Sequence, residues 1–128
     1  MKYATHIAAG LLGLLFIVFG MNHFLHFIPM PPGPPEGSPP ALFFAAIFPT
    51  GFLTFVKVLE VLGGVLVVIP KTRNIGLLVL APIIVNIFAF HIFLLKGAAL
   101  VDPVMALLLI LPLFLLWSGR GKFAGLLN

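Results

Sequence analysis

The chain has 128 residues, of which 62% are hydrophobic and 8% are charged, and its mean hydropathy is +1.27. A soluble domain carries about 25% charged residues, so seven Lys+Arg and three Asp+Glu are too few to solvate a globular surface. The basic residues form no cluster, which argues against a nucleic-acid partner. Because the chain has no cysteine, its own side chains cannot supply disulfides, iron–sulfur ligands or thiol redox chemistry. These features predict an integral membrane protein whose first partner is the lipid bilayer.

Four apolar segments are candidates to cross a bilayer, which takes about 20 residues within a range of roughly 17–25. They cover about residues 4–27, 52–69, 74–95 and 103–118, the last at the short end of that range. Apolar residues surround all sides of these segments, as expected for helices that contact lipid on one side and protein on the other. We therefore expect one domain over residues 1–128, an all-α, antiparallel bundle of four transmembrane helices.

The first connection has an unusual composition. Residues 29–40 contain seven prolines in twelve residues, and proline lacks the N–H group that helices and sheets need. We expect an extended, proline-rich outer loop over 28–40. Residues 41–48 are apolar but would give only about 12 Å of helix, too little to cross, so they predict a short interfacial helix. Gly10, Gly13 and the pair Gly63 and Gly64 allow close helix contacts.

The distribution of charge predicts the orientation. Five basic residues fall at the two ends of the chain and in the second connection, against one, Lys96, in the outer loops. Since basic residues favour the cytoplasmic side, both termini are expected in the cytoplasm, with the protein in the cell (inner) membrane. The five are Lys2, Lys71, Arg73, Arg120 and Lys122.

Polar side chains inside the apolar segments are the candidate site. An ionisable group at mid-membrane costs about 2.5–3.5 kcal/mol on insertion scales, so such groups persist where they pair, face a cavity or act. At about 1.5 Å of rise per residue, three helices place polar groups in the same outer half of the bilayer. The predicted cluster is Asn22, His26, Lys57, Glu60, Asn86 and His91.

Spacing indicates which of these residues share a helix face. Lys57 and Glu60 are three residues apart, so they face the same way. Asn86 and His91 are five apart and lie about 140° from each other around a helix, so a shared pocket needs a bend, which Pro82 would supply. A structural interpretation stays open, because buried ion pairs and membrane amides also serve to hold helices together.

At these residues the chain resembles the DoxX family of small four-span membrane proteins. The matching stretches are residues 13–31, with Asn22 and His26; 56–64, with Lys57, Glu60 and the glycine pair; and 81–91. Members often have a lysine or another polar residue after the asparagine, where this chain has His23. The resemblance implies a four-helix membrane bundle. Relatives include the membrane subunit of a thiosulfate:quinone oxidoreductase and members of oxidative-stress complexes.

Several functions are compatible with these residues. The polar cluster would suit a quinone site in an oxidoreductase-associated membrane subunit, with electrons supplied by a redox partner subunit. The alternatives are a non-catalytic structural or assembly subunit, and a small transporter, which would need to form a homo-oligomer to alternate access. Haem b between His26 and His91 is a further alternative, and so is a metal held by histidines alone.

Overall fold

The structure is a computed structural model that describes residues 2–28, 33–96 and 102–127, and within these ranges its regular structure is helical. A 3₁₀ turn, Pro70–Thr72, leads into α4, a π-helical turn, Phe90–Leu94, extends it, and a second 3₁₀ turn, Gly125–Leu127, follows α6. The expected all-α class is confirmed. The described α-helices are α1 (Lys2–Leu25), α2 (Pro39–Ile47), α3 (Phe52–Val68), α4 (Arg73–Ala89), α5 (Pro103–Ser118) and α6 (Arg120–Ala124).

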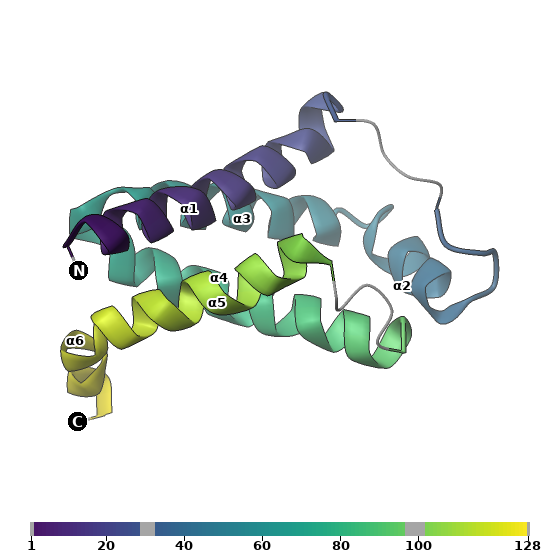
Figure 1. Cartoon of the computed structure of the whole chain (residues 1–128). Coiled ribbons are helices and arrows are strands. Elements are labelled where there is room, and N and C mark those ends of the chain that lie inside the picture. The colour runs from purple at the N-terminus through teal and green to yellow at the C-terminus, as the bar shows by residue number, and fades with distance from the viewer. Residues whose placement is uncertain (1, 29–32, 97–101, 128) are drawn as a thin grey trace.

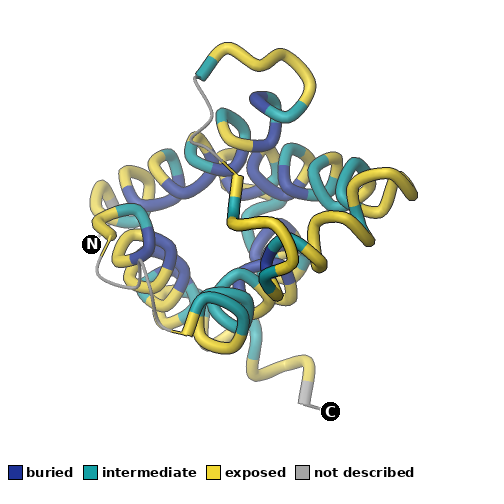
Figure 2. Tube along the Cα trace, turned by 90° about the vertical axis from the view of Figure 1, so that its right-hand side faces the viewer, coloured by how far each residue is buried: buried dark blue, intermediate teal, exposed yellow. Residues whose placement is uncertain are grey.

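The four longer helices lie side by side (Figure 1). α1 and α4 lead away from the end of the molecule at which both chain termini lie, and α3 and α5 return to it. α1 packs against α3 and α5, and α4 packs against the same two helices. Their buried faces turn toward one another (Figure 2), and the centre is filled by apolar side chains such as Leu12, Phe16, Val67, Leu80 and Leu115.

Two helical stretches of the described chain, Tyr3–Leu25 and Pro70–Leu94, are long and apolar enough to cross a membrane. The second contains Pro82, and α4 continues through it. α2 and α3 would together make a third span, but they are bent by 84° at their junction. α5 is apolar and shorter. Two or three candidate spans indicate that the protein associates with a lipid bilayer.

Glycines set the distance between α1, α3 and α4. A Cβ atom added at Gly64 would lie 2.7 Å from the carbonyl oxygen of Gly13, so the backbones of α1 and α3 touch there. On the other side of α3, a Cβ at Gly76 of α4 would lie 2.9 Å from the carbonyl oxygen of Gly63. The paired glycines thus let α3 pack closely on both neighbours, as the sequence predicted. Gly10 has no described atom near enough to make such a contact.

The short helix expected over residues 41–48 is α2, and it begins earlier than expected, at Pro39. The Ser38 side chain accepts a hydrogen bond from the Ala41 amide (3.4 Å) and caps the helix, and a proline in the first turn needs no N–H partner. Gly51 then adopts φ of 83°, a conformation open to glycine, where the chain turns into α3. Pro29, Pro31 and Pro32 of the expected outer loop lie outside the described residues.

Candidate functional site

An ion pair lies inside the helix bundle. The Nζ atom of Lys57 is 3.3 Å from Oε2 of Glu60, and the two side chains are 24% and 7% exposed. Both belong to α3 and share a face because they are three residues apart. Gly20 of α1 covers them closely: a Cβ there would lie 3.3 Å from the Lys57 carbonyl oxygen and 3.5 Å from Cβ of Glu60. The absence of a side chain at Gly20 therefore lets α1 pack closely on the part of α3 that carries the pair.

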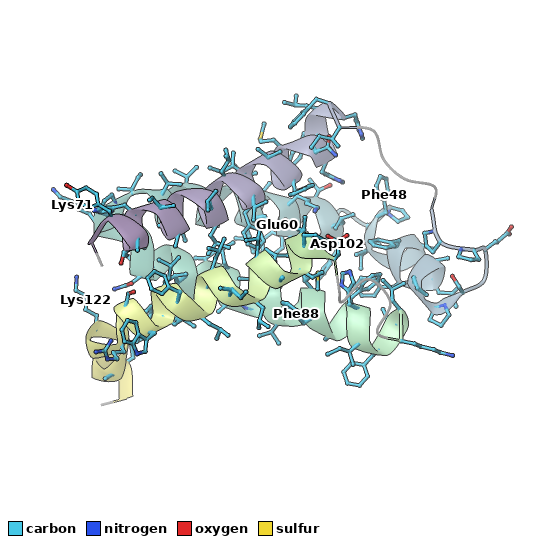
Figure 3. All side chains as sticks on the ribbon, in the orientation of Figure 1. Phe48, Glu60, Lys71, Phe88, Asp102 and Lys122 are labelled. Atoms are coloured by element: carbon cyan, nitrogen blue, oxygen red, sulfur yellow. The ribbon has the colours of Figure 1, made fainter. Side chains whose placement is uncertain are left out.

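The ion pair faces a cleft of about 360 Å³, which is within the size range of small-molecule sites. We call it the ion-pair cleft. Its polar side chains are Lys57, Glu60, His91 and Asp102, which come from α3, the π-helical turn and the start of α5. In Figure 3 Glu60 and Asp102 are labelled near each other, with Glu60 closer to the end at which the chain termini lie. The remaining walls are apolar and are formed by Leu15, Phe16, Phe19, Ile87, Val104, Met105 and Leu108.

The π-helical turn places His91 in this cleft. Its Nδ1 atom is 2.8 Å from the carbonyl oxygen of Ile87, and since a carbonyl only accepts, Nδ1 carries the proton. With the proton on Nδ1, Nε2 is the ring atom that can accept a hydrogen bond in neutral imidazole. Single π-helical turns are frequent at functional sites because they reorient side chains locally.

Asp102 is the cleft residue that the sequence reasoning missed. It caps α5, with its Oδ1 atom accepting a hydrogen bond from the Val104 amide (2.9 Å), and Pro103 follows at the first helical position. An aspartate and a proline directly before an apolar run form a recognisable helix start. That signal, combined with the expected level of the outer helix ends, could have placed Asp102 beside His91.

Asn22 and His26 shape the end of α1 and do not line the cleft. Asn22 is buried and its Oδ1 atom accepts a hydrogen bond from the Ile28 amide (2.8 Å). His26 is exposed, has φ of 52°, and donates its backbone amide to the Asn22 carbonyl oxygen (2.8 Å). Between them, His23 joins α1 to α3 through a hydrogen bond of 3.2 Å between its Nε2 atom and Oγ1 of Thr54.

Asn86 also lies outside the cleft lining. Its side chain is exposed, and its Nδ2 atom donates to the carbonyl oxygen of Pro82 on its own helix (2.8 Å). The structure thus brings together Lys57, Glu60 and His91 from the predicted cluster and adds Asp102. Among the described residues no group of three or more His, Asp or Glu side chains is arranged to hold a metal ion. His91 lines the cleft without His26, the other histidine of the haem hypothesis.

Comparisons with known proteins give one distant relative. No family model matches the chain, and no solved structure matches it. The uncharacterized protein YwoB of Bacillus subtilis (strain 168) is 37% identical over 67 residues, which are 52% of this chain and 42% of that protein. The chain therefore spans less than half the length of the curated relative that it matches. This similarity indicates distant, partial homology between two proteins and assigns no family.

Proposed function

We propose that this chain is a four-span, DoxX-like membrane protein that serves as the membrane subunit of a redox system and binds a quinone headgroup in the ion-pair cleft. One observation carries the proposal. A lysine–glutamate pair, in which the glutamate is buried and the lysine is partly buried, shares a cleft with a histidine and an aspartate, and the other walls of that cleft are apolar. Polar groups of this kind are costly within a membrane and mark functional sites. The resemblance of residues 13–31, 56–64 and 81–91 to the DoxX family supports the same assignment.

Four spans are the arrangement that this proposal requires. α3 and α5 have 17 and 16 residues, or about 25 Å of helix each, close to the hydrocarbon thickness of about 30 Å. Both lie alongside α1 and α4, which belong to the two helical stretches that are long enough to cross, Tyr3–Leu25 and Pro70–Leu94. The basic residues near both termini and before α4 then lie in the cytoplasm.

Cysteine labelling tests this topology. Single cysteines at Glu36, Lys71 and Lys122 replace side chains in the first connection, the second connection and the C-terminal region. We expect a membrane-impermeant maleimide to label Lys71→Cys and Lys122→Cys from the cytoplasmic side and Glu36→Cys from the opposite side. Labelling of all three from one side would exclude four spans.

The polar groups of the cleft suit the two oxygens of a quinone. The Lys57 ammonium group donates to a quinone carbonyl oxygen, and Nε2 of neutral His91 accepts from a quinol hydroxyl. Phe16, Phe19 and Met105 provide an apolar surface for the ring. Reduction takes up two electrons and two protons: the partner redox subunit supplies the electrons, and solvent supplies the protons through exposed Asp102 and buried Glu60.

The test measures quinone retention in lipid nanodiscs of one composition, each holding one copy of the chain and loaded with decylubiquinone. Lys57→Met combined with Glu60→Gln removes both charges without leaving either unpaired. We expect this variant to fold and to retain no more quinone than empty discs. Asn86→Leu, a polar-to-apolar change on an exposed face, should retain as much as the wild type.

A structural role for the ion pair is the second candidate, because both residues belong to one helix and contact each other directly. That role predicts that the double variant folds, retains quinone like the wild type and assembles normally. The retention experiment therefore separates the two functions, because only a quinone site predicts that the double variant stays folded and loses the quinone.

A further inference from the structure

A second cleft lies at the other end of the bundle, where both chain termini are found (Figure 1). It has a volume of about 340 Å³ and lies between the beginning of α1, the beginning of α4, the end of α5 and α6. We call it the basic cleft. Its polar side chains are Thr5, Arg73, Asn74, Ser118 and Lys122. Hydrogen-bond donors from separate parts of the chain thus converge on one space.

The charge at this end is uncompensated. The chain has only three acidic residues: Glu36 precedes α2, and Glu60 and Asp102 line the ion-pair cleft. No carboxylate side chain of the described residues lines the basic cleft, whereas Arg73 and Lys122 both do. Lys71 and Lys122 both lie at this end of the molecule, apart from each other (Figure 3). An anion from outside the chain is the natural counterpart of these cations.

Hydrogen bonds hold the Arg73 guanidinium in place and leave its Nη1 group as a donor for a ligand. Its Nε atom donates to the carbonyl oxygen of Val67 (2.9 Å), and its Nη2 atom donates to that of Val68 (3.3 Å) and lies 3.3 Å from Nδ1 of His6. These bonds fix the plane of the guanidinium. Its Nη1 group makes no hydrogen bond to any residue that the structure describes, so it remains a donor of fixed direction.

Asn74 is positioned by the glycine that it faces. A Cβ atom at Gly119 would lie 3.0 Å from Oδ1 of Asn74 and 3.5 Å from its Nδ2 atom, so any larger residue there would displace the amide. Gly119 ends α5 and precedes α6, which carries Lys122. The glycine therefore lets the amide of α4 and the ammonium group of α6 line the same cleft.

The neighbouring aromatic side chain indicates the depth of this cleft in a membrane. Trp117 is exposed near the end of α5, and the guanidinium of Arg120 lies 4.4 Å from the centre of its ring. The Nη1 atom of Arg120 also donates to the Trp117 carbonyl oxygen (2.8 Å). Tryptophan beside basic residues at the end of an apolar helix is typical of the headgroup layer. In a bilayer, this pattern would place the basic cleft at the level of the lipid phosphates.

We propose that the basic cleft binds the phosphate group of an anionic phospholipid. The guanidinium and ammonium groups match phosphate oxygens, and the Ser118 hydroxyl and the Asn74 amide add neutral donors. Leu115 and Pro70 line the same cleft. They can contact the apolar part of a lipid, which free phosphate lacks. This site is separate from the ion-pair cleft and does not depend on the quinone proposal.

Native mass spectrometry of the full chain, released from detergent after titration with phosphatidylglycerol or phosphatidylcholine, tests the site. Lys122 is suited to substitution because its side chain is exposed. We expect the wild type to retain phosphatidylglycerol in preference, and Lys122→Gln to weaken that retention about fivefold, as for the loss of one basic contact at a lipid surface. Lys71→Gln is the matched control, because it removes a cation at the same end that does not line the cleft; it should retain the lipid like the wild type.

Three results would overturn the proposal. The first is equal retention of the two lipids by the wild type. The second is an equal loss in Lys71→Gln and Lys122→Gln, which would indicate diffuse attraction to the whole basic end. The third is complete displacement of phosphatidylglycerol by millimolar inorganic phosphate, which would assign the cleft to a soluble anion. Asn74→Leu provides an independent variant that leaves every charge in place and should also weaken retention.

Discussion

The two clefts lie at opposite ends of one set of helices and treat charge in opposite ways. In the ion-pair cleft, Lys57 lies 3.3 Å from Glu60, and Asp102 is a further carboxylate in the lining. In the basic cleft, Arg73 and Lys122 have no carboxylate beside them. A cation buried among helices needs a partner from the chain, because lipid tails offer none. A cation at the bilayer surface can leave its neutralisation to water and lipid phosphate.

This difference also separates the kinds of ligand that the clefts suit. In the ion-pair cleft Lys57 and Glu60 neutralise each other, and the further carboxylate, Asp102, is exposed. This favours a neutral molecule with polar edges beside the pair, since a charged one would leave a net charge in an apolar region. A cleft with uncompensated cations favours an anion. The helices between them are joined by the glycine contacts of α3, so variants can damage both clefts together or each one alone.

The largest expected effect comes from a variant that should damage both. Gly64→Val adds a side chain where the Gly13 carbonyl oxygen would lie 2.7 Å from the new Cβ, and backbone cannot move aside as a flexible side chain can. We expect a loss of stability of about 3 kcal/mol, at the upper end for overpacked sites, measured by thermal unfolding in detergent. Gly10→Ala is the control: no described atom lies within 4 Å of its added Cβ, so its unfolding temperature should not fall. Equal effects of the two changes would contradict the close α1–α3 contact.

The next effect should be confined to the ion-pair cleft. Glu60→Gln leaves the Lys57 ammonium group without its partner, and breaking a fully buried pair costs about 3–5 kcal/mol in soluble proteins. Since Lys57 is 24% exposed, we expect a smaller loss, about 2 kcal/mol. Adding Lys57→Met should recover most of it. Lipid retention in the basic cleft should not change in either variant, and a parallel loss there would show that the clefts are coupled.

A third variant separates the charge of Asp102 from its role as a helix cap. Asp102→Ala removes the acceptor of the Val104 amide and should cost about 1 kcal/mol. Asp102→Asn keeps a capping oxygen and should cost less than about 0.5 kcal/mol, while removing the carboxylate from the cleft. If the quinone proposal is right, Asp102→Asn keeps the unfolding temperature and lowers the rate of quinol formation. An unchanged rate would limit Asp102 to capping α5.

Much of the architecture follows from the sequence because it depends on composition and local rules. The long apolar runs predicted the helices α1, α3, α4 and α5, and the glycine pair Gly63 and Gly64 predicted the close packing of α3. The start of α2 was placed too late because prolines were treated only as breakers. In the first turn of a helix, beside the cap of Ser38, proline is tolerated.

The site was harder to predict because the depth of a side chain follows from its position along the helix, whereas its direction depends on the rotation of that helix. Counting residues from a helix end placed polar groups at similar depths, and it assigned Lys57 and His91 to the same predicted cluster. The direction that each side chain faces depends on how its helix is turned. The π-helical turn that carries His91, Phe90–Leu94, shifts the residues after Ala89 relative to a regular helix, and apolar sequence gives no signal of it.

Asn86 is the residue on which depth and orientation disagree, and it gives the smallest expected effect. Its side chain is exposed and donates a hydrogen bond to the Pro82 carbonyl oxygen of its own helix. Asn86→Leu therefore removes a bond within α4 and no described contact between helices. We expect a change in stability within about 0.5 kcal/mol, measured by thermal unfolding, and unchanged quinone retention. A membrane favours leucine on a lipid-facing surface, so a slight gain is also consistent with this placement. A large loss of quinone retention with intact folding would instead place the ligand on the outer face of α4. It would contradict the proposal that the ion-pair cleft binds the quinone.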